Sequence, residues 1–322
     1  MQKYIFYFEL PTFNVIFATY MINIAFLISV HTDAPHLRRL ICSLPKEADF
    51  FVHVDAKVDI QPFLDATQGL NVHFISKRTD IMWGSFGQVM YQMNLIHEAL
   101  SSTKHFDYLI SISGLEYPLW KNSRILEEIE NNNGKEYLFA TCMSDKNQDS
   151  TKLYREYRFF NIYAWKYGTL KSKFRVAIRH IVNLLGIKKK LTIPCNGKKF
   201  KLYKGGSWWG ITNELATYVW YIYSHEKKFV NYFKTAFAPD ETFIHTIACN
   251  TVFAQNCTII DKKSTSLEEL SPLTYIEYGK EIKILTEEDF DALINSNKMF
   301  CRKTITGKSD KLLDKIDEYR NR

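Results

Sequence analysis

Segments of strand and helix character alternate along the first third of this chain. Apolar runs of strand length occupy residues 22–31, 50–54, 72–75 and 108–113, and helical patterns occupy 35–42, 62–66 and 87–100. This alternation is typical of an α/β fold built around a largely parallel sheet. Ligands of such folds bind beyond the carboxyl ends of the strands. The residues that end these strands are therefore the first candidates for a site: His31, Asp55, Arg78, Ser113 and Gly114.

The composition suits one large globular domain or two tightly joined lobes, because 46% of the 322 residues are hydrophobic and 15% are aromatic. A formal net charge of +7 fits a nucleic acid, an anionic membrane or a phosphorylated small molecule, and charge alone does not choose among them. The sequence contains neither a GxGxxG motif nor a Walker loop, which disfavours dinucleotide and P-loop sites. The six scattered cysteines form no CxxC pair, so we expect reduced thiols in a cytosolic protein.

Two acids precede an apolar helical stripe at residues 238–248. Asp240 and Glu241 follow Pro239, and the apolar residues after them recur at helical spacing, so a helix start is predicted here. The helix macrodipole favours negative charge at this position, and an ordinary capped helix is the simpler interpretation of the pair.

A segment rich in glycine and tryptophan lies upstream of these acids. Gly205 and Gly206 would let a ligand approach the backbone, and indole rings offer flat apolar faces. Neighbouring residues of a strand point to opposite faces, so only one of Trp208 and Trp209 can fill the same core. The other indole is then available to a ligand.

These segments resemble the core-2/I-branching N-acetylglucosaminyltransferase and peptide O-xylosyltransferase family, glycosyltransferase family 14. The resemblance covers about residues 22–303 and rests on seven short motifs in the same order. They are His31 after the first strand, residues 53–57, Trp83-Gly84, residues 113–118, the Gly-Trp-Trp segment, Pro239-Asp240-Glu241 and Arg302-Lys303. The resemblance implies a GT-A-type α/β nucleotide-sugar-binding fold, with a central mixed sheet flanked by helices, over residues 21–303. Residues 1–20 then form an N-terminal extension and residues 304–322 a C-terminal helical tail.

The family resemblance also implies an activity and a site. It indicates an inverting transferase that moves a sugar, GlcNAc or xylose, from a UDP-sugar to a hydroxyl of a glycan, with Glu241 as the base. The donor diphosphate would contact Lys280, Arg302 and Lys303. The nucleoside would contact His31, Asp55, Arg78, Ser113, Gly114 and Glu116, where Glu116 stands in place of the family's usual Asp. The acceptor would contact Lys152, Arg155, Trp208, Trp209, Asp240 and Tyr278.

Two further stretches have the pattern of capped helix starts. Ser85 with Gln88 fits a capping box after Trp83-Gly84, and Asp289-Phe-Asp291 follows Thr286 in a second capped start. Asp289-Phe-Asp291 is the one DxD motif in the sequence, and we expect first-turn acids there rather than metal ligands. The family resembled works without a metal, so no metal or other cofactor is expected. A metal-dependent DxD-type transferase is the enzymatic alternative, and a non-catalytic basic module that binds membranes or nucleic acid is the other.

Residues 170–185 carry an apolar helical stripe, with Lys171, Arg175 and Arg179 on another face. We expect the stripe to pack on the domain and the basic face to be solvated, which is the common arrangement. Peripheral contact with an anionic membrane, on its inner face, is the alternative. No nucleic acid partner is expected, because no named nucleic-acid-binding motif accompanies the basic residues.

Overall fold

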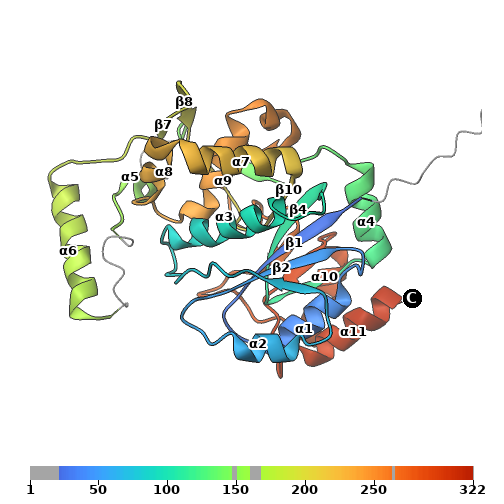
Figure 1. Cartoon of the computed structure of the whole chain (residues 1–322). Helices are drawn as coiled ribbons and strands as arrows, with labels where there is room; N and C mark the ends of the chain where they lie inside the picture. Colours follow the sequence, from blue (N-terminus) through green and yellow to red (C-terminus); the bar gives the residue numbers. More distant parts are fainter. Residues whose placement is uncertain (1–21, 147–150, 160–167, 263–264, 322) are drawn as a thin grey trace, which may run out of the picture.

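The computed structural model describes residues 22–146, 151–159, 168–262 and 265–321. At its centre lies a five-stranded sheet in the order β10-β4-β1-β2-β3 (Figure 1). These strands are β1 (Ile24–Val30), β2 (Asp49–Val54), β3 (Val72–Phe74), β4 (Tyr108–Ser113) and β10 (Trp209–Thr212). β10 runs antiparallel to β4, whereas the other pairs are parallel, so the sheet is mixed. The predicted alternation of strands and helices is confirmed. The predicted extension, residues 1–20, lies outside the described residues.

Helices cover both faces of this sheet because side chains alternate along each strand. Leu27 of β1 packs in the cluster that contains α3 (Gly87–Leu100) and α7 (Asn213–His225). Its neighbour Phe26 packs in the opposite cluster, with α1 (Ala34–Ser43) and α4 (Asn122–Asn131). Both faces of the sheet are therefore buried, which explains why these strands are continuous apolar runs in the sequence.

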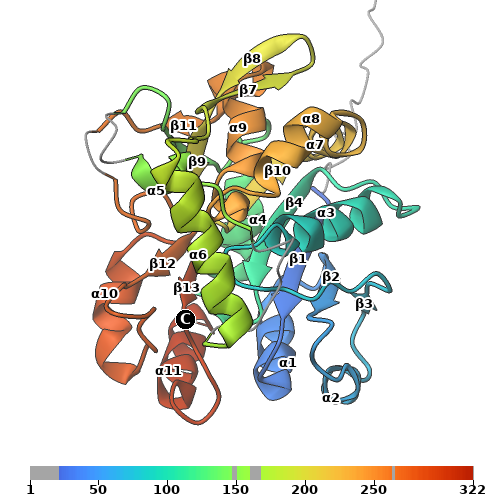
Figure 2. The ribbon, with the colours of Figure 1, turned by 90° about the vertical axis from the view of Figure 1, so that its left-hand side faces the viewer.

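Two small sheets and a hairpin extend the body (Figure 2). They comprise β12 (Thr274–Ile276), β13 (Phe300–Arg302) and β5 (Glu116–Pro118); β11 (Thr258–Ile259), β6 (Phe139–Cys142) and β9 (Tyr203–Gly205); and the hairpin β7 (Thr192–Cys195) with β8 (Lys198–Lys201). The remaining helices are α2 (Gln61–Ala66), α5 (Lys152–Arg155), α6 (Leu170–Leu184), α8 (Lys227–Phe233), α9 (Phe243–Cys249), α10 (Phe290–Asn295) and α11 (Asp310–Asn321). Short 3₁₀ helices occupy Pro239–Glu241, Val252–Asn256 and Glu287–Asp289.

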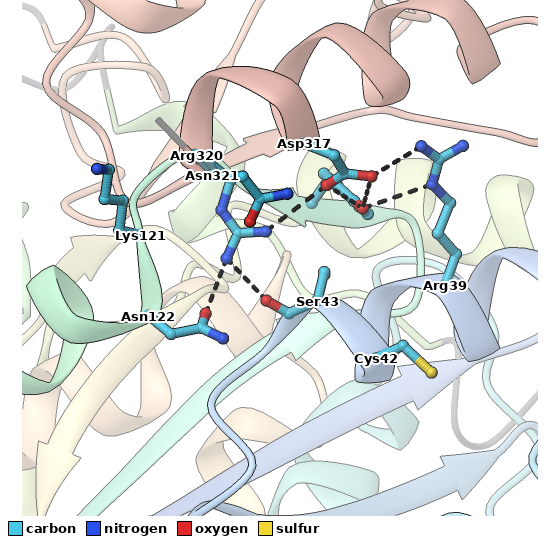
Figure 3. Close-up of a pocket in the computed structure, with 9 residues that line it drawn as sticks. Arg39, Cys42, Ser43, Lys121, Asn122, Asp317, Arg320 and Asn321 are labelled. Carbon is cyan, nitrogen blue, oxygen red and sulfur yellow. Dashed lines mark hydrogen bonds and ion pairs between the residues drawn. The ribbon is translucent and has the colours of Figure 1, made fainter.

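The C-terminal helix α11 is fastened to the body by two arginines (Figure 3). Arg320 donates to the backbone oxygens of Ser43 and Trp120 and to Asn122 Oδ1. Asp317 accepts from Arg39 and from the Tyr117 hydroxyl. These groups surround a cavity of about 420 Å³, and both of its arginines are already engaged by protein oxygens. The cavity therefore marks where α11 docks on α1 and β5.

Helix α6 is oriented opposite to our expectation. Its apolar residues Leu170 and Leu184 are exposed, whereas Ser172 and Arg175 are buried against the body. The expectation failed because periodicity defines which residues share a face but not what that face contacts. Within the part of the chain that the structure describes, no helix combines the length and apolar character needed to cross a membrane.

A close crossing of β9 and α9 depends on Gly205. A methyl group at this position would overlap the imidazole ring of His245 and the carbonyl oxygen of Phe139. The next residue, Gly206, is similarly confined, because a methyl group would lie 2.9 Å from the Leu270 carbonyl oxygen. These glycines allow close packing against other segments of the protein, whereas we expected from the sequence that they would allow a ligand to approach.

Gly205→Ala should therefore lower the free energy of unfolding by about 1–3 kcal/mol, the usual cost of overpacking. Chemical denaturation measures the change. Gly279→Ala is the control, because a methyl group there meets its nearest neighbouring atom at 3.8 Å. Equal stability of the two variants would contradict this account of the crossing.

Candidate active site

A cavity of about 460 Å³, here called the cleft, lies beyond the carboxyl ends of the parallel strands. His31 follows β1, Asp55 follows β2, and Ser113 ends β4. Because β10 is antiparallel, the residues that precede it reach the same edge. The cleft lining includes His31, Asp55, Lys57, Ile81, Trp83, Gln88, Ser113, Gly114, Ser207, Trp208, Asp240, Glu241, Tyr278 and Arg302.

Asp240 lies in the cleft wall, in the 3₁₀ turn that precedes α9. Ala238 has a left-handed backbone, with φ 41°, and directs the chain into this turn. Asp240 Oδ2 accepts from Ser207 Oγ at 2.7 Å and from Gln88 Nε2 at 3.0 Å. Its Oδ1 atom is buried and finds no hydrogen-bond donor among the residues described. One oxygen is thus fixed by two side chains, and the other has no side-chain donor in the described parts of the chain.

Glu241 is paired with a lysine across the cleft wall. Lys204 Nζ lies 3.5 Å from Glu241 Oε2 and 5.8 Å from the centre of the Tyr154 ring. Burial raises the pKa of Glu241 to about 7, although the positive charge of Lys204 opposes this. Burial also raises the pKa of Asp240. A carboxylate with a pKa near neutrality is suited to accept a proton.

Arg302, in β13, places a positive charge in the cleft lining. The Arg302 guanidinium donates to Ser113 Oγ and lies 4.7 Å from the centre of the Trp208 ring. Its buried Nε atom has no acceptor in the described parts of the chain. Arg302 thus brings a positive charge to the cleft lining and keeps one buried donor unused by the described residues.

Glu116 stands opposite Arg302 in the antiparallel pair of β5 and β13. It is fully buried and accepts from Ser113 N at 2.9 Å and from Thr274 Oγ1 at 3.0 Å. Burial raises the pKa of Glu116 to about 7, and Arg302 opposes the rise. Glu116 thus orients the loop after β4 and lies behind the cleft surface.

The structure brings nine of the predicted site residues into the cleft lining. They are His31, Asp55, Ser113, Gly114, Trp208, Asp240, Glu241, Tyr278 and Arg302. Arg78 instead donates to the backbone oxygens of Val54, Asp55 and Val58, and so braces the turn after β2. Trp209 is completely buried in the core. The two indoles do face opposite sides of the strand, and Trp208 is the one in the cleft.

Besides Arg78, four predicted cationic residues lie outside the cleft lining. Lys152 and Lys280 are exposed, and Arg155 Nε donates to Thr151 Oγ1 at 3.0 Å. Lys303 is close enough to influence the site, because its charge adds to the effects of burial and Arg302 that lower the pKa of His31.

Several residues in the site were not predicted from the sequence. Gln88 was interpreted as part of a capping box, yet its side chain joins Gly84 N to Asp240, while Ser85 Oγ accepts from Gly87 N at 3.2 Å. Lys57 Nζ lies 3.2 Å from Asp55 Oδ2 and is also exposed to the cleft. The short HVDAK segment, residues 53–57, was the one signal that could have identified Lys57.

The predicted capped start at Thr286 is confirmed. Asp289 Oδ2 accepts from Thr286 N at 2.9 Å, and Asp289 Oδ1 accepts from Lys283 Nζ at 2.7 Å. Both oxygens of this carboxylate are thus engaged away from the cleft.

All six cysteines are free thiols.

Comparison with known proteins identifies relatives of this chain. The family model described as "Core-2/I-Branching enzyme" matches residues 24–294. A beta-1,3-galactosyl-O-glycosyl-glycoprotein beta-1,6-N-acetylglucosaminyltransferase from Homo sapiens is 23% identical over 232 residues, which cover 70% of this chain and 48% of the relative. Xylosyltransferase sqv-6 from Caenorhabditis elegans is 22% identical over 227 residues, which cover 67% of this chain and 25% of that protein. The chain thus spans about half the length of the human relative.

Among solved structures, the bifunctional glycosyltransferase WbbM in its apo form aligns with 92% of this chain and 49% of its own. The sequence identity is 12% and the TM-score is 0.36.

Proposed function

The chain belongs to the Core-2/I-Branching enzyme family, and on that premise we propose that it is an inverting, metal-independent glycosyltransferase that uses a UDP-sugar donor. The transferred sugar would be N-acetylglucosamine or xylose, the sugars in the names of the human and nematode relatives. The acceptor would be a hydroxyl group of a glycan. The observation that carries the proposal is the partly buried Glu241 paired with Lys204, in the same cleft as the Arg302 guanidinium.

In the proposed reaction Glu241 acts as general base. Its carboxylate takes the proton of the acceptor hydroxyl while the hydroxyl oxygen attacks the anomeric carbon of the donor sugar. The bond from this carbon to the diphosphate oxygen breaks, and its electron pair leaves with UDP. A single displacement of this kind inverts the anomeric centre. Asp240, held by Ser207 and Gln88, would orient the acceptor through its unpartnered oxygen.

The negative charge that develops on the leaving diphosphate requires stabilisation. Arg302 supports this role because its Nε donor is buried and unused by the described residues around it. Lys303 follows it directly, and Lys280 would complete the set if its exposed side chain turned inward on binding. A metal site at Asp289-Phe-Asp291 is disfavoured, because both Asp289 oxygens already hold the helix cap and Lys283.

The other ligand groups follow from the arrangement of the cleft. Asp55 and His31 lie at the ends of adjacent strands and would contact the uracil or ribose, together with the backbone at Ser113 and Gly114. Arg78 and Glu116 would support the nucleoside site indirectly, through the turns that they brace. The face of Trp208 and the phenol of Tyr278 would contact a sugar ring, since aromatic rings provide flat apolar surfaces.

Glu241→Gln should reduce transfer by about a hundredfold or more, because the amide keeps the shape of the side chain but cannot accept the proton. Steady-state kinetics with the matched donor and acceptor, together with UDP calorimetry, would test this, and UDP affinity should change little. Asp240→Asn is the companion variant. Near-normal turnover in Glu241→Gln with total loss in a folded Asp240→Asn would assign the base to Asp240.

The rate should also depend on pH in a defined way. Glu241 is active when deprotonated, so kcat/KM should rise with pH up to its pKa of about 7 and then level off. Lys204 lowers that pKa, and Lys204→Met should move the rise to higher pH by about one unit. Lys201 forms an exposed ion pair with Asp145, so Lys201→Met should leave the pH profile unchanged. A rise centred near the ordinary pKa of a glutamate would contradict the assignment.

Metal independence predicts that UDP binds equally well in excess EDTA and in Mn²⁺ when measured by calorimetry. Affinity should fall as salt is added, because the contacts are ionic. Lys303→Ala should weaken binding, whereas Lys308→Ala, an exposed lysine outside the cleft, should not. Binding that appears only with Mn²⁺ or Mg²⁺ would support a metal-dependent transferase instead.

A further inference from the structure

Helix α6 lies at one end of the molecule, well apart from the central sheet (Figure 1). Several of its apolar side chains are exposed to solvent. Leu170 is 83% exposed and Leu184 is 87% exposed, and Ile181 between them is 56% exposed. Leu185 and Ile187 continue the exposed apolar surface past the end of the helix. Singly exposed apolar residues are ordinary, but a contiguous row of them marks an interaction surface.

The exposed apolar residues lie on one side of α6. Leu170, Ala177, Ile181 and Leu184 are spaced seven, four and three residues apart, so they share one side of the helix. Ser172 and Arg175 lie on the opposite side and are buried. Arg175 Nη1 lies 3.6 Å from Met82 Sδ, so the polar side of α6 contacts the body. The helix is therefore packed in the reverse of the usual sense.

Basic residues flank this outward face. Lys171 and Lys173 are exposed beside its first turn, and Lys188 and Lys190 are exposed just beyond its last turn. The sequence contains no aspartate or glutamate between Glu156 and Glu214. The helix and the segments that flank it in sequence thus carry basic residues and no acids, so a negatively charged, apolar partner complements them.

These requirements select one class of occupant. A second copy of this chain would bring the same basic flanks together, which is unfavourable. Residues 1–21 are apolar but contain one acid, Glu9, and one base, Lys3, so they offer no negative surface. A bilayer that contains anionic lipid supplies both an apolar interior and negative headgroups. Helices with a strongly apolar face and lysine-rich flanks lie in such interfaces.

We propose that α6 docks this protein on anionic bilayers, with Leu170, Ile181 and Leu184 inserted among the lipid chains and the neighbouring lysines at the headgroups. The docked helix would hold the cleft close to the bilayer. Met82, which α6 contacts through Arg175, lies between Ile81 and Trp83, and both of these residues line the cleft. The proposal concerns binding and does not depend on the catalytic assignment.

Sedimentation of the full chain with vesicles tests the proposal. The protein should bind vesicles of phosphatidylcholine mixed with phosphatidylglycerol, bind phosphatidylcholine alone weakly, and dissociate as salt is raised. The double variant Ile181→Gln/Leu184→Gln should bind at least about tenfold more weakly, because it removes inserted apolar groups without changing charge. Both side chains are exposed, so its circular dichroism and melting temperature should match those of the parent.

Two further variants separate the contributions. Lys171→Gln/Lys173→Gln should reduce the preference for phosphatidylglycerol. Val252→Gln/Tyr221→Gln, which removes exposed apolar residues on α7 and the neighbouring turn, should bind like the parent. Equal binding by the parent and Ile181→Gln/Leu184→Gln would overturn the proposal. So would a dimer in light scattering that this variant dissociates, because a second copy would then cover the face.

Discussion

The cleft depends on two adjacent carboxylates at the start of α9, of which Asp240 is buried and Glu241 is partly buried. Transfer of a carboxylate out of water is costly unless it is paired or hydrogen-bonded. The compensating groups come from distant parts of the chain: Gln88 from α3, Lys204 from β9, and Ser207 from the turn between β9 and β10. Asp240 and Glu241 consequently occupy their positions only when these segments have assembled. Burial raises the pKa of Glu241 to about 7 against the opposing charge of Lys204, which makes the site suitable for proton transfer.

Local signals in the sequence predicted the fold well. Helix α3 and strand β4 begin and end where the hydrophobic pattern indicated, because both elements are specified by the period of their own residues. The prediction was wrong for α6, although its period was correct. A period defines an apolar face, and the contacts of that face depend on the remainder of the molecule. In α6 the buried Arg175 contacts Met82, whereas Leu170 faces solvent, and no local pattern distinguishes this from the usual arrangement.

The site could be predicted in part for similar reasons. The ends of strands can be recognised in the sequence, so His31, Asp55 and Ser113 were correctly predicted to lie in the cleft. Arg78 was also found there, but its donors serve backbone oxygens, and the chemistry that binds a ligand is the same chemistry that braces a turn. Gln88 was missed because its partner Asp240 is 152 residues away, beyond any pattern in a single sequence.

Trp208 and Trp209 join the cleft to the core through one peptide bond. Trp209 is fully buried among residues of α3 and α7, while Trp208 lies against Arg302 in the cleft. Interiors are packed as densely as crystals of small molecules, so a change in volume near Trp209 shifts the backbone of β10 as well. Such a shift would rotate the Trp208 indole and alter the width of the cleft. Substitutions deep in the interior, far from any substrate, thus provide an evolutionary route to a different ligand preference.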